Sequence, residues 1–296
     1  MNRFHFNFIL IYAMIYLTNS NIDGFRLKRF VGGRAALAGE YKYQVQLRLF
    51  DENNPETSSY YNCTGALISR ELVLTSVGCV YDKIEKKIRD PSKYLIVTGT
   101  ILNENSFEDE HTRRVKAIEV HPNQTRIYPY PHDIALLLLD EPFNEANNEI
   151  EPIQMISKHE FDEVIRKYET CHSSGWGHTK YYETGAFSDT LQSVNIQIMN
   201  QDQCNLYGPP EGTICAGAAD VSACRGDGGA PLVCGGKLTG IAFYGFNYYY
   251  TDMCIEGHIT DFYVDLIYHR DWIDQTISKL FFGDFSNDNI NIRLFI

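Results

Sequence analysis

The sequence predicts an all-β fold with one helix near its C-terminus, and three observations lead to this prediction. Residues 44–49 and 194–198 alternate polar and apolar side chains, which is the pattern of a half-buried strand. Glycine, asparagine and tyrosine are plentiful while long helical periodicity is scarce, which favours strands joined by turns. Helical spacing occurs in one late segment, at Leu266, Ile273, Ile277 and Leu280, beside Trp272. The 296 residues are enough to bury a full core.

The N-terminal residues have the features of a secretory signal. Arg3 supplies a positive start, residues 8–17 form an apolar run, and residues 18–20 are small and polar. A retained anchor is the alternative, although the run is short for a membrane span. We expect residues 1–20 to be a signal peptide and residues 21–29 a short propeptide. The mature protein is then secreted and extracellular.

Eight cysteines in a chain with an export signal indicate disulfide bonds. None is spaced as Cys-x-x-Cys, which argues against a zinc site. Residues 104–110 are acidic and could offer oxygen atoms to calcium, but they match no recognised calcium loop, so a solvated hairpin is favoured. We expect no metal and no cofactor.

The formal net charge of −12 argues against nucleic acid and membrane partners, because such a surface repels phosphate backbones and anionic lipid. The charge would favour basic partners, although solubility in a secreted fluid is the favoured explanation. We expect protein partners and a monomeric chain.

Residues 224–231 carry the most informative motif, Cys-Arg-Gly-Asp-Gly-Gly-Ala-Pro. It resembles the nucleophile loop of the trypsin/chymotrypsin-like serine proteases, which reads Cys-x-Gly-Asp-Ser-Gly-Gly-Pro. Ala230 stands at the family's second glycine, and Gly228 stands at the catalytic serine. Glycine has no side chain, so this position offers no nucleophile.

Two further segments resemble those that carry the rest of the family's catalytic triad. Residues 72–79, Leu-Val-Leu-Thr-Ser-Val-Gly-Cys, resemble Leu-Thr-Ala-Ala-His-Cys, with Gly78 at the histidine. Residues 132–137 resemble Asn-Asp-Ile-Ala-Leu-Leu and retain Asp133. The reaction needs an imidazole that accepts the serine proton and returns it to the leaving group, which Gly78 cannot do. We expect Asp133 to accept backbone hydrogen bonds instead.

The resemblance covers residues 30–280 and depends on the order and spacing of its motifs. It implies two antiparallel six-stranded β-barrels of the trypsin-like type, the first over about residues 30–147 and the second over about residues 148–265. A closing helix over about residues 266–280 and a tail over residues 281–296 follow.

Two segments lie outside the recognised motifs. Residues 141–170 are polar, acidic and irregular, which suits a link between two barrels. The tail alternates apolar residues with others, so it could add an edge strand or pack on a barrel.

The resemblance also implies an activation junction. Arg29 precedes Phe30 and a Val-Gly-Gly sequence. In the family, cleavage after the basic residue frees an amino group that pairs with the aspartate before the nucleophile, here Asp227. Phe30 is larger than the family's usual isoleucine or valine, so its insertion could be imperfect. A dibasic sorting or degradation site is the alternative.

Further positions of the family's substrate cleft can be assigned. Gly226 falls at the oxyanion hole, Ser222 at the base of the primary pocket, and Asp261 on the pocket wall. The family's Ser-Trp-Gly segment is replaced by Phe243, Tyr244 and Gly245. We expect Phe243 to crowd the cleft. Asp261 could attract a basic side chain, but a partly exposed aspartate in a collapsed pocket is favoured.

The resemblance implies four disulfide bonds, which pair Cys63 with Cys79, Cys171 with Cys234, Cys204 with Cys215, and Cys224 with Cys254. The cysteine count alone allows many other connectivities. Two glycosylation sequons begin at Asn123 and Asn62. Asn123 is the better acceptor, because the middle residue of the other sequon is an expected disulfide cysteine.

Residues 36–44 are similar to the trypsin-like group 3 allergens of mites, a family that includes inactivated paralogues in scabies mites. The leading hypothesis is therefore a secreted, inactive homologue that acts by binding proteins, with inhibition of host complement or other defence proteins as the implied role. One alternative is an active serine endopeptidase. Another is a non-catalytic cofactor of a proteolytic cascade, which usually carries a cysteine-rich N-terminal module that residues 21–29 do not provide.

A rewired hydrolase is not favoured. His132 precedes Asp133, but adjacent strand residues face opposite sides. Ser76 and Ser222 lie near the expected site, and neither has an evident base.

Overall fold

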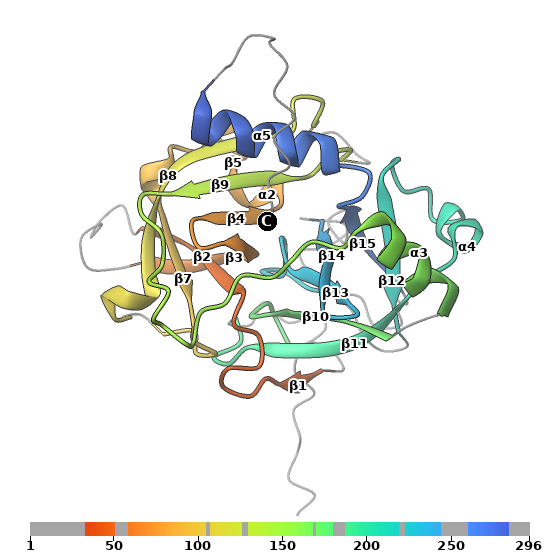
Figure 1. Ribbon diagram of the computed structural model, residues 1–296, viewed down its shortest axis with the longest axis horizontal. Helices are drawn as coiled ribbons and strands as arrows, with labels where there is room; N and C mark the ends of the chain where they lie inside the picture. The colour runs from red at the N-terminus through yellow and green to blue at the C-terminus, as the bar shows by residue number, and fades with distance from the viewer. Residues whose placement is uncertain are drawn as a thin grey trace, which may run out of the picture.

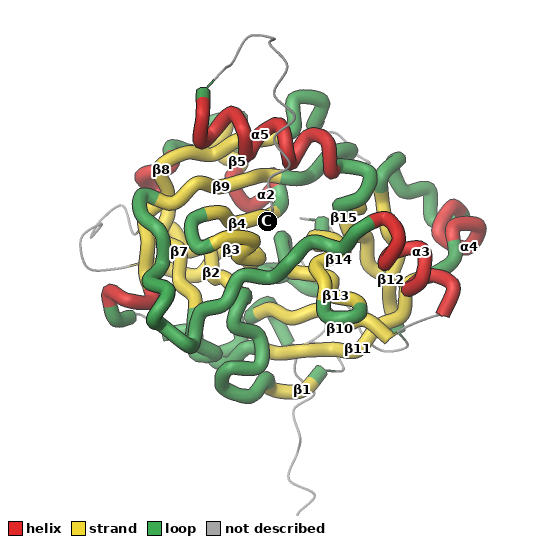
Figure 2. Tube along the Cα trace, viewed as in Figure 1, coloured by secondary structure: helices red, strands yellow, loops and turns green. Residues whose placement is uncertain are grey.

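The computed structural model describes residues 33–50, 59–104, 107–125, 130–167, 170–179, 187–218, 223–243 and 260–283. Most of the ordered structure is strand, arranged as two barrels with helices on the outside (Figures 1 and 2). Among the helices in these ranges, none combines the length and apolar character that a membrane span requires.

The first barrel closes in the strand order β2-β3-β4-β9-β8-β7, and every pairing is antiparallel. Its strands are β2 (Gln44–Phe50), β3 (Ser59–Ser69), β4 (Leu72–Thr75), β7 (Tyr94–Thr98), β8 (Thr112–Val120) and β9 (Ala135–Leu139). The shorter elements between them are α2 (Val77–Val80), β5 (Tyr81–Asp82), β6 (Lys87–Ile88) and the 3-10 turns η1 (Pro91–Lys93) and η2 (Asp109–His111). Leucine, isoleucine and valine side chains from all these barrel strands fill the interior.

The second barrel runs in the order β11-β10-β13-β14-β15-β12, and the pairing of β12 with β11 closes the ring. Its strands are β10 (Thr170–Gly175), β11 (Gln192–Ile198), β12 (Thr213–Gly217), β13 (Pro231–Cys234), β14 (Lys237–Ala242) and β15 (Asp261–Asp265), with β1 (Arg34–Ala35) added on β11. The predicted pair of six-stranded antiparallel barrels is therefore confirmed.

Strand β2 differs from the expected half-buried strand, because its polar side chains are buried as well. Gln44 donates to the Ser174 carbonyl oxygen at 2.9 Å. Gln46 donates to the Leu102 carbonyl oxygen at 2.8 Å. The Arg48 guanidinium donates to Ser59, Gln46 and Asn103. These polar side chains share one face of the strand, opposite Val45, Leu47 and Leu49, and both faces can be buried because each polar group finds a hydrogen-bond partner.

The segment expected to be an irregular link contains a helix, α3 (Lys158–Lys167). Its start has a reciprocal pair of hydrogen bonds: the Ser157 amide donates to the Glu160 carboxylate at 2.8 Å, and the Glu160 amide donates to the Ser157 hydroxyl at 3.3 Å. This capping box satisfies two backbone donors that would otherwise lack partners. The prediction of irregular structure was wrong at these residues.

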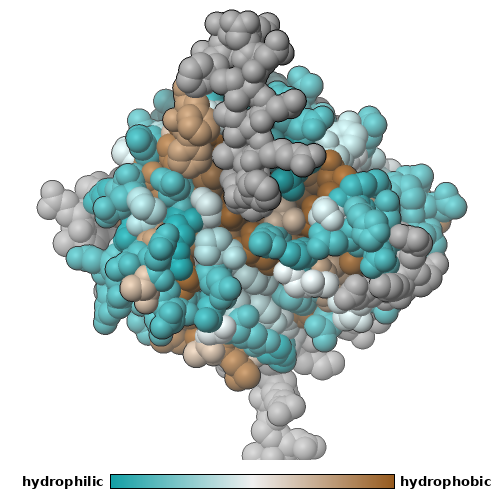
Figure 3. Space-filling model, in the orientation of Figure 1, coloured by the Kyte–Doolittle hydropathy of each residue, from teal (hydrophilic) through white to brown (hydrophobic). Residues whose placement is uncertain are grey.

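The closing helix α5 (Arg270–Phe282) begins later and ends later than expected. Residues 266–269 form a turn instead, in which the Asp265 carboxylate accepts the amides of Ile267 at 2.7 Å and Tyr268 at 3.3 Å. At its other end, α5 includes the first residues of the expected tail and stops at Gly283, which has φ +77°. Residues 284–296 lie outside the described residues. Figure 3 shows a largely hydrophilic face with apolar surface at the end of α5, where Phe281 and Phe282 are exposed.

Three of the expected disulfide bonds are present, namely Cys63–Cys79, Cys171–Cys234 and Cys204–Cys215. Cys224 is also disulfide-bonded. Its expected partner, Cys254, lies outside the described residues.

Candidate active site

Three segments meet where the sequence motifs predict a catalytic site: α2, the turn before β9, and the loop before β13. The Gly78 amide on α2 donates to Asp133 Oδ1 at 3.0 Å. The neighbouring Cys79 Sγ lies 3.3 Å from the Gly228 carbonyl oxygen. That carbonyl also accepts the Thr64 amide at 2.9 Å. The structure therefore brings Gly78, Asp133 and Gly228 together, as expected.

Asp133 has the structural role that the sequence predicts. Its side chain is buried, with 1% exposure, and accepts a backbone hydrogen bond from the residue at the predicted histidine position. Gly78 and Gly228 provide a backbone but no titratable or nucleophilic side chain. Neither Gly78 nor Gly228 has a positive φ, so the backbone dihedral angles at these positions do not themselves require glycine.

The groups considered as substitutes are occupied elsewhere. Ser76 is buried, and its hydroxyl lies 3.2 Å from the sulfur of the bridged Cys79. His132 stacks on His121, with ring centroids 4.2 Å apart, and its Nδ1 lies 3.0 Å from His269 Nε2. Ser222 lies outside the described residues. Within the described ranges, neither Ser76 nor His132 forms a nucleophile–base pair.

His121, His132 and His269 form a histidine cluster that sequence reasoning missed. His269 Nδ1 lies 2.8 Å from the Asp265 carbonyl oxygen, which can only accept, so His269 Nε2 accepts from His132 Nδ1. Burial, with a smaller contribution from the neighbouring imidazoles, lowers the pKa of His121 and His269 to about 4, although the hydrogen bond to the Asp265 carbonyl opposes this shift at His269. Burial also lowers the pKa of His132. The three imidazoles are therefore neutral near pH 7. No local sequence signal could have placed His269 beside the other two.

The Asp227 side chain is buried beside the Gly-Trp-Gly segment, residues 175–177. Its carboxylate accepts the Gly177 amide at 2.9 Å and the Cys224 amide at 2.9 Å. A side chain at Gly177 or Gly175 would overlap this carboxyl group, which explains why glycine flanks Trp176. Burial, together with the nearby charge of Asp261, raises the pKa of Asp227 to about 7, against the lowering effect of the two amides. Its expected partner, the amino group released between Arg29 and Phe30, lies outside the described residues.

The predicted oxyanion position, Gly226, is held by close contacts. Its φ is +98°, and a side chain there would lie 2.8 Å from the ring of Phe187. The Gly226 carbonyl oxygen accepts the Tyr61 hydroxyl at 2.6 Å. Both the left-handed backbone and the nearby ring require glycine at this position.

The expected crowding of the cleft by Phe243 was wrong. The Phe243 ring is only 8% exposed and meets Phe262 edge to face at 6.3 Å, so it fills the core. Asp261 is also buried, at 6% exposure, and accepts the Ala223 amide at 2.8 Å. It is therefore not the partly exposed aspartate that the sequence suggested. Tyr244 and Gly245 lie outside the described residues.

The two predicted glycosylation acceptors differ in their surroundings. Asn62 donates its side-chain amide to the Cys79 carbonyl oxygen at 3.1 Å and is partly buried. Asn123 is exposed in the turn after β8. Exposure of the side chain is what an acceptor needs, so Asn123 remains the preferred prediction.

A candidate cation site lies within the acidic segment. Glu108, Glu110 and His111 place ligand atoms within 4.8 Å of one another, the only such group within the described ranges. Both glutamates are exposed, and His111 Nδ1 lies 2.9 Å from the Thr98 carbonyl oxygen. Calcium usually takes six or more oxygen ligands, so these three side chains would form only part of a site.

A family model described as Trypsin matches residues 30–273. The chain belongs to the trypsin family. Trypsin eta of Drosophila melanogaster is 30% identical over 274 residues, which covers 90% of this chain and 93% of that protein. Trypsin zeta of Drosophila erecta is 29% identical over 268 residues, which covers 86% of this chain and 86% of that protein.

A solved structure of neuropsin, a serine protease expressed in the limbic system of mouse brain, aligns with a TM-score of 0.63. The alignment covers 83% of this chain and 98% of neuropsin, at 24% sequence identity. At this identity the comparison supports the trypsin-like fold alone. The disulfide bonds agree with the oxidising compartments in which trypsin-like proteases usually occur.

Proposed function

We propose that this protein is a secreted trypsin-family member without proteolytic activity that acts by binding other proteins. The observation that supports the proposal is the make-up of the site. Gly78 and Gly228 occupy the positions at which the family's motifs carry histidine and serine, and Asp133 accepts a backbone amide. A glycine can neither accept the nucleophile's proton nor attack a carbonyl carbon. In serine proteases, removing the nucleophile lowers turnover on the order of a millionfold.

An active serine endopeptidase is the second candidate, because the relatives reported above are named trypsins. Such an enzyme would need a nucleophile and a base from other residues. The buried environment of Ser76 and the engagement of His132 with His269 both disfavour that arrangement.

Hydrolysis of peptide substrates separates the two candidates. The protein, expressed with its signal sequence and cut after Arg29, is incubated with a mixed peptide library, with an authentic trypsin as the positive control. The proposal predicts cleavage no faster than in buffer. Cleavage that a serine-directed phosphonate abolishes would reject the proposal in favour of an active peptidase. The variant carrying both Gly78→His and Gly228→Ser shows whether the rest of the cleft can still support turnover.

Secretion is part of the proposal, and residues 1–20 together with the disulfide bonds support it. For the partner we propose host defence proteins such as complement components, because residues 36–44 are similar to the mite group 3 family. A cofactor role in a proteolytic cascade is the alternative. Capture from host plasma, together with a complement lysis assay, distinguishes these roles. Neither capture nor inhibition of lysis would be expected if the complement role is wrong.

A further inference from the structure

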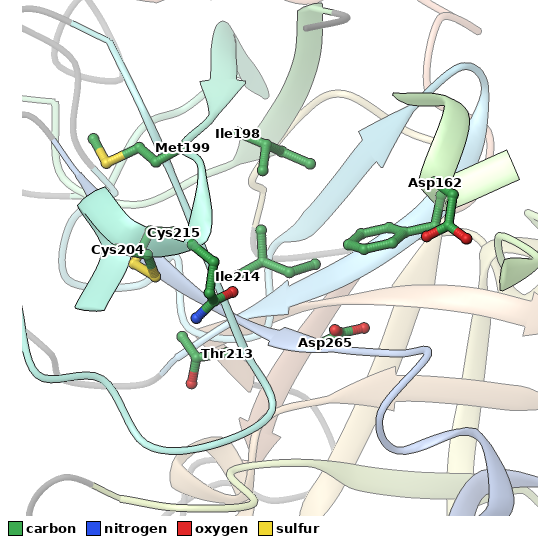
Figure 4. A pocket seen from close by; sticks show the side chains of 10 residues that line it. Asp162, Ile198, Met199, Cys204, Thr213, Ile214, Cys215 and Asp265 are labelled. Carbon is green, nitrogen blue, oxygen red and sulfur yellow. A yellow bond between two sulfur atoms is a disulfide. The ribbon is translucent and has the colours of Figure 1, made fainter. Parts of the chain in front are cut away.

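A groove with a volume of about 530 Å³ lies on the second barrel, away from the residues of the candidate active site. Its walls come from α3, β11, α4 (Gln201–Asn205), β12 and the end of β15. In Figure 4, Met199 and Cys204 lie on one side and Asp162 on the other, with Ile214 between them. The volume is in the range of pockets that hold a ligand or an anchoring side chain.

The walls of the groove are apolar but incompletely covered. Phe161, Ile198 and Met199 are only half-buried, while Ile214 is buried between them. An aliphatic or aromatic group placed in the groove would remove this surface from water, at about 25 cal/mol per Å².

Two carboxylates give the groove its charge. Asp162 borders it from α3, and Asp265 borders it from the end of β15. Asp265 Oδ1 already accepts two backbone amides, yet burial still raises the pKa of this group. Thr213 also lines the groove at 6% exposure, and its hydroxyl oxygen has no hydrogen-bond partner within the described residues. A ligand that carries positive charge and hydrogen-bond donors would satisfy these groups.

Lys158 shows what chemistry the edge of the groove accepts. Its ammonium group lies 2.8 Å from Asp162 Oδ1 and 5.7 Å from the centroid of the Phe161 ring. The edge therefore already holds a cation between a carboxylate and an aromatic face, in an arrangement that also suits arginine. This ion pair is exposed, so a competing cation can displace it at small cost.

We propose that this groove binds a basic segment of a protein partner, in which an arginine or lysine anchor is flanked by apolar residues. The aliphatic stem of the anchor packs on Phe161 and Ile198, and its charged end reaches Asp162 and Asp265. Arginine and aromatic anchors in such pockets carry much of the free energy of protein–protein binding. The net charge of −12 attracts a basic partner from a distance. This inference rests on the proposed protein-binding function and identifies the surface through which the partner binds.

The test uses fluorescence anisotropy with the processed full chain and a labelled peptide, Gly-Phe-Arg-Leu-Arg-Phe-Gly. The matched peptide carries glutamate in place of both arginines. We expect saturable binding of the basic peptide only. Asp162→Asn combined with Asp265→Asn weakens it about tenfold or more, because both charges are removed while the amide oxygen can still accept the turn hydrogen bonds. Phe161→Ala also weakens binding.

A variant that is expected to strengthen binding instead of weakening it makes the test more stringent. Lys158→Met removes the resident cation, so it tightens binding of the basic peptide about threefold. On the first barrel, Asp109→Asn combined with Glu104→Gln makes the same change in net charge as the double groove variant, and Lys116→Met makes the same change as Lys158→Met. Both controls leave the affinity within a factor of about two. Thermal unfolding of each variant verifies that the fold is intact.

The inference is overturned if the peptide does not bind, if the groove variants bind as tightly as the unaltered chain, or if the first-barrel controls change the affinity equally. The proposed function fails separately, through hydrolysis by the unaltered chain. If the chain captures plasma proteins and the groove variants capture them equally well, this inference is wrong while the proposed protein-binding function is still supported.

Discussion

Asp133 and Asp227 are both buried carboxylates beside the candidate active site, and they differ in how they are held. Each is 1% exposed and accepts backbone amides. The amide that Asp133 accepts belongs to Gly78, a position whose backbone suits any L-amino acid. The carboxyl group of Asp227 fits between glycines that leave no room for a side chain. The site of Asp227 is therefore fixed by packing, whereas the backbone at positions 78 and 228 does not itself require glycine.

The largest expected effect on stability comes from filling the space around the Asp227 carboxyl group. Gly177→Ala would drive a methyl group into the Asp227 carboxyl group, so it should lower the free energy of unfolding by about 3 kcal/mol or more. Denaturant unfolding measures this. Gly236→Ala is the matched control, because its φ is +75° but open space surrounds it, and it should cost only about 1–2 kcal/mol. Equal losses in the two variants would contradict crowding around the Asp227 carboxyl group.

Asp227 should also make stability fall as pH rises. Its pKa is raised from 3.8 to about 7 in the folded protein, so the folded form keeps a proton that the unfolded chain loses. The stabilisation is fully present below about pH 4 and is lost progressively up to about pH 7, with a total on the order of 4 kcal/mol. Asp227→Asn should abolish this pH dependence in the uncleaved chain.

Cleavage after Arg29 sharpens the same prediction. If the new amino group reaches Asp227, the ion pair lowers the pKa of the carboxyl group, and the loss of stability towards neutral pH disappears. Urea unfolding at several pH values, before and after cleavage, measures the change. An identical pH dependence in the unaltered chain and in Asp227→Asn would refute the assignment.

The histidine cluster should act in the opposite direction and more weakly. Its pKa values are lowered in the folded state, so the unfolded chain binds more protons as pH falls from about 6.5 to about 4, and stability falls with it. His121→Phe keeps a stacked ring without a titratable group and should reduce the acid loss by about 1 kcal/mol, allowing for partial solvent exposure. His159→Gln, at an exposed position on α3, should have no such effect. Thermal unfolding between pH 4 and 7 tests the pair of variants.

The sequence was sufficient for the architecture because its motifs lie at positions where packing allows few alternatives. The glycines beside Trp176 seat Asp227, and the described disulfide bonds join the predicted strands and loops. The order and spacing of these motifs resemble those of the trypsin-like proteases, and that resemblance implied both barrels.

The remaining features depend on contacts that a local pattern does not encode. The capping box of Ser157 and Glu160 lies in a polar stretch and starts a helix there. Phe243 turned into the core to meet Phe262, and the polar residues of β2 found partners in distant segments. The groove beside α3 joins this helix to β12 and β15, which are separated from it by long stretches of sequence.

Labelling with a fluorophosphonate tests the central claim most directly, since this reagent forms a covalent adduct with an activated serine. The protein cut after Arg29 is treated with the reagent, digested and examined by mass spectrometry, beside the Gly78→His/Gly228→Ser variant. The account predicts no adduct on any serine of the unaltered chain. A stoichiometric adduct on the folded, unaltered protein would contradict it.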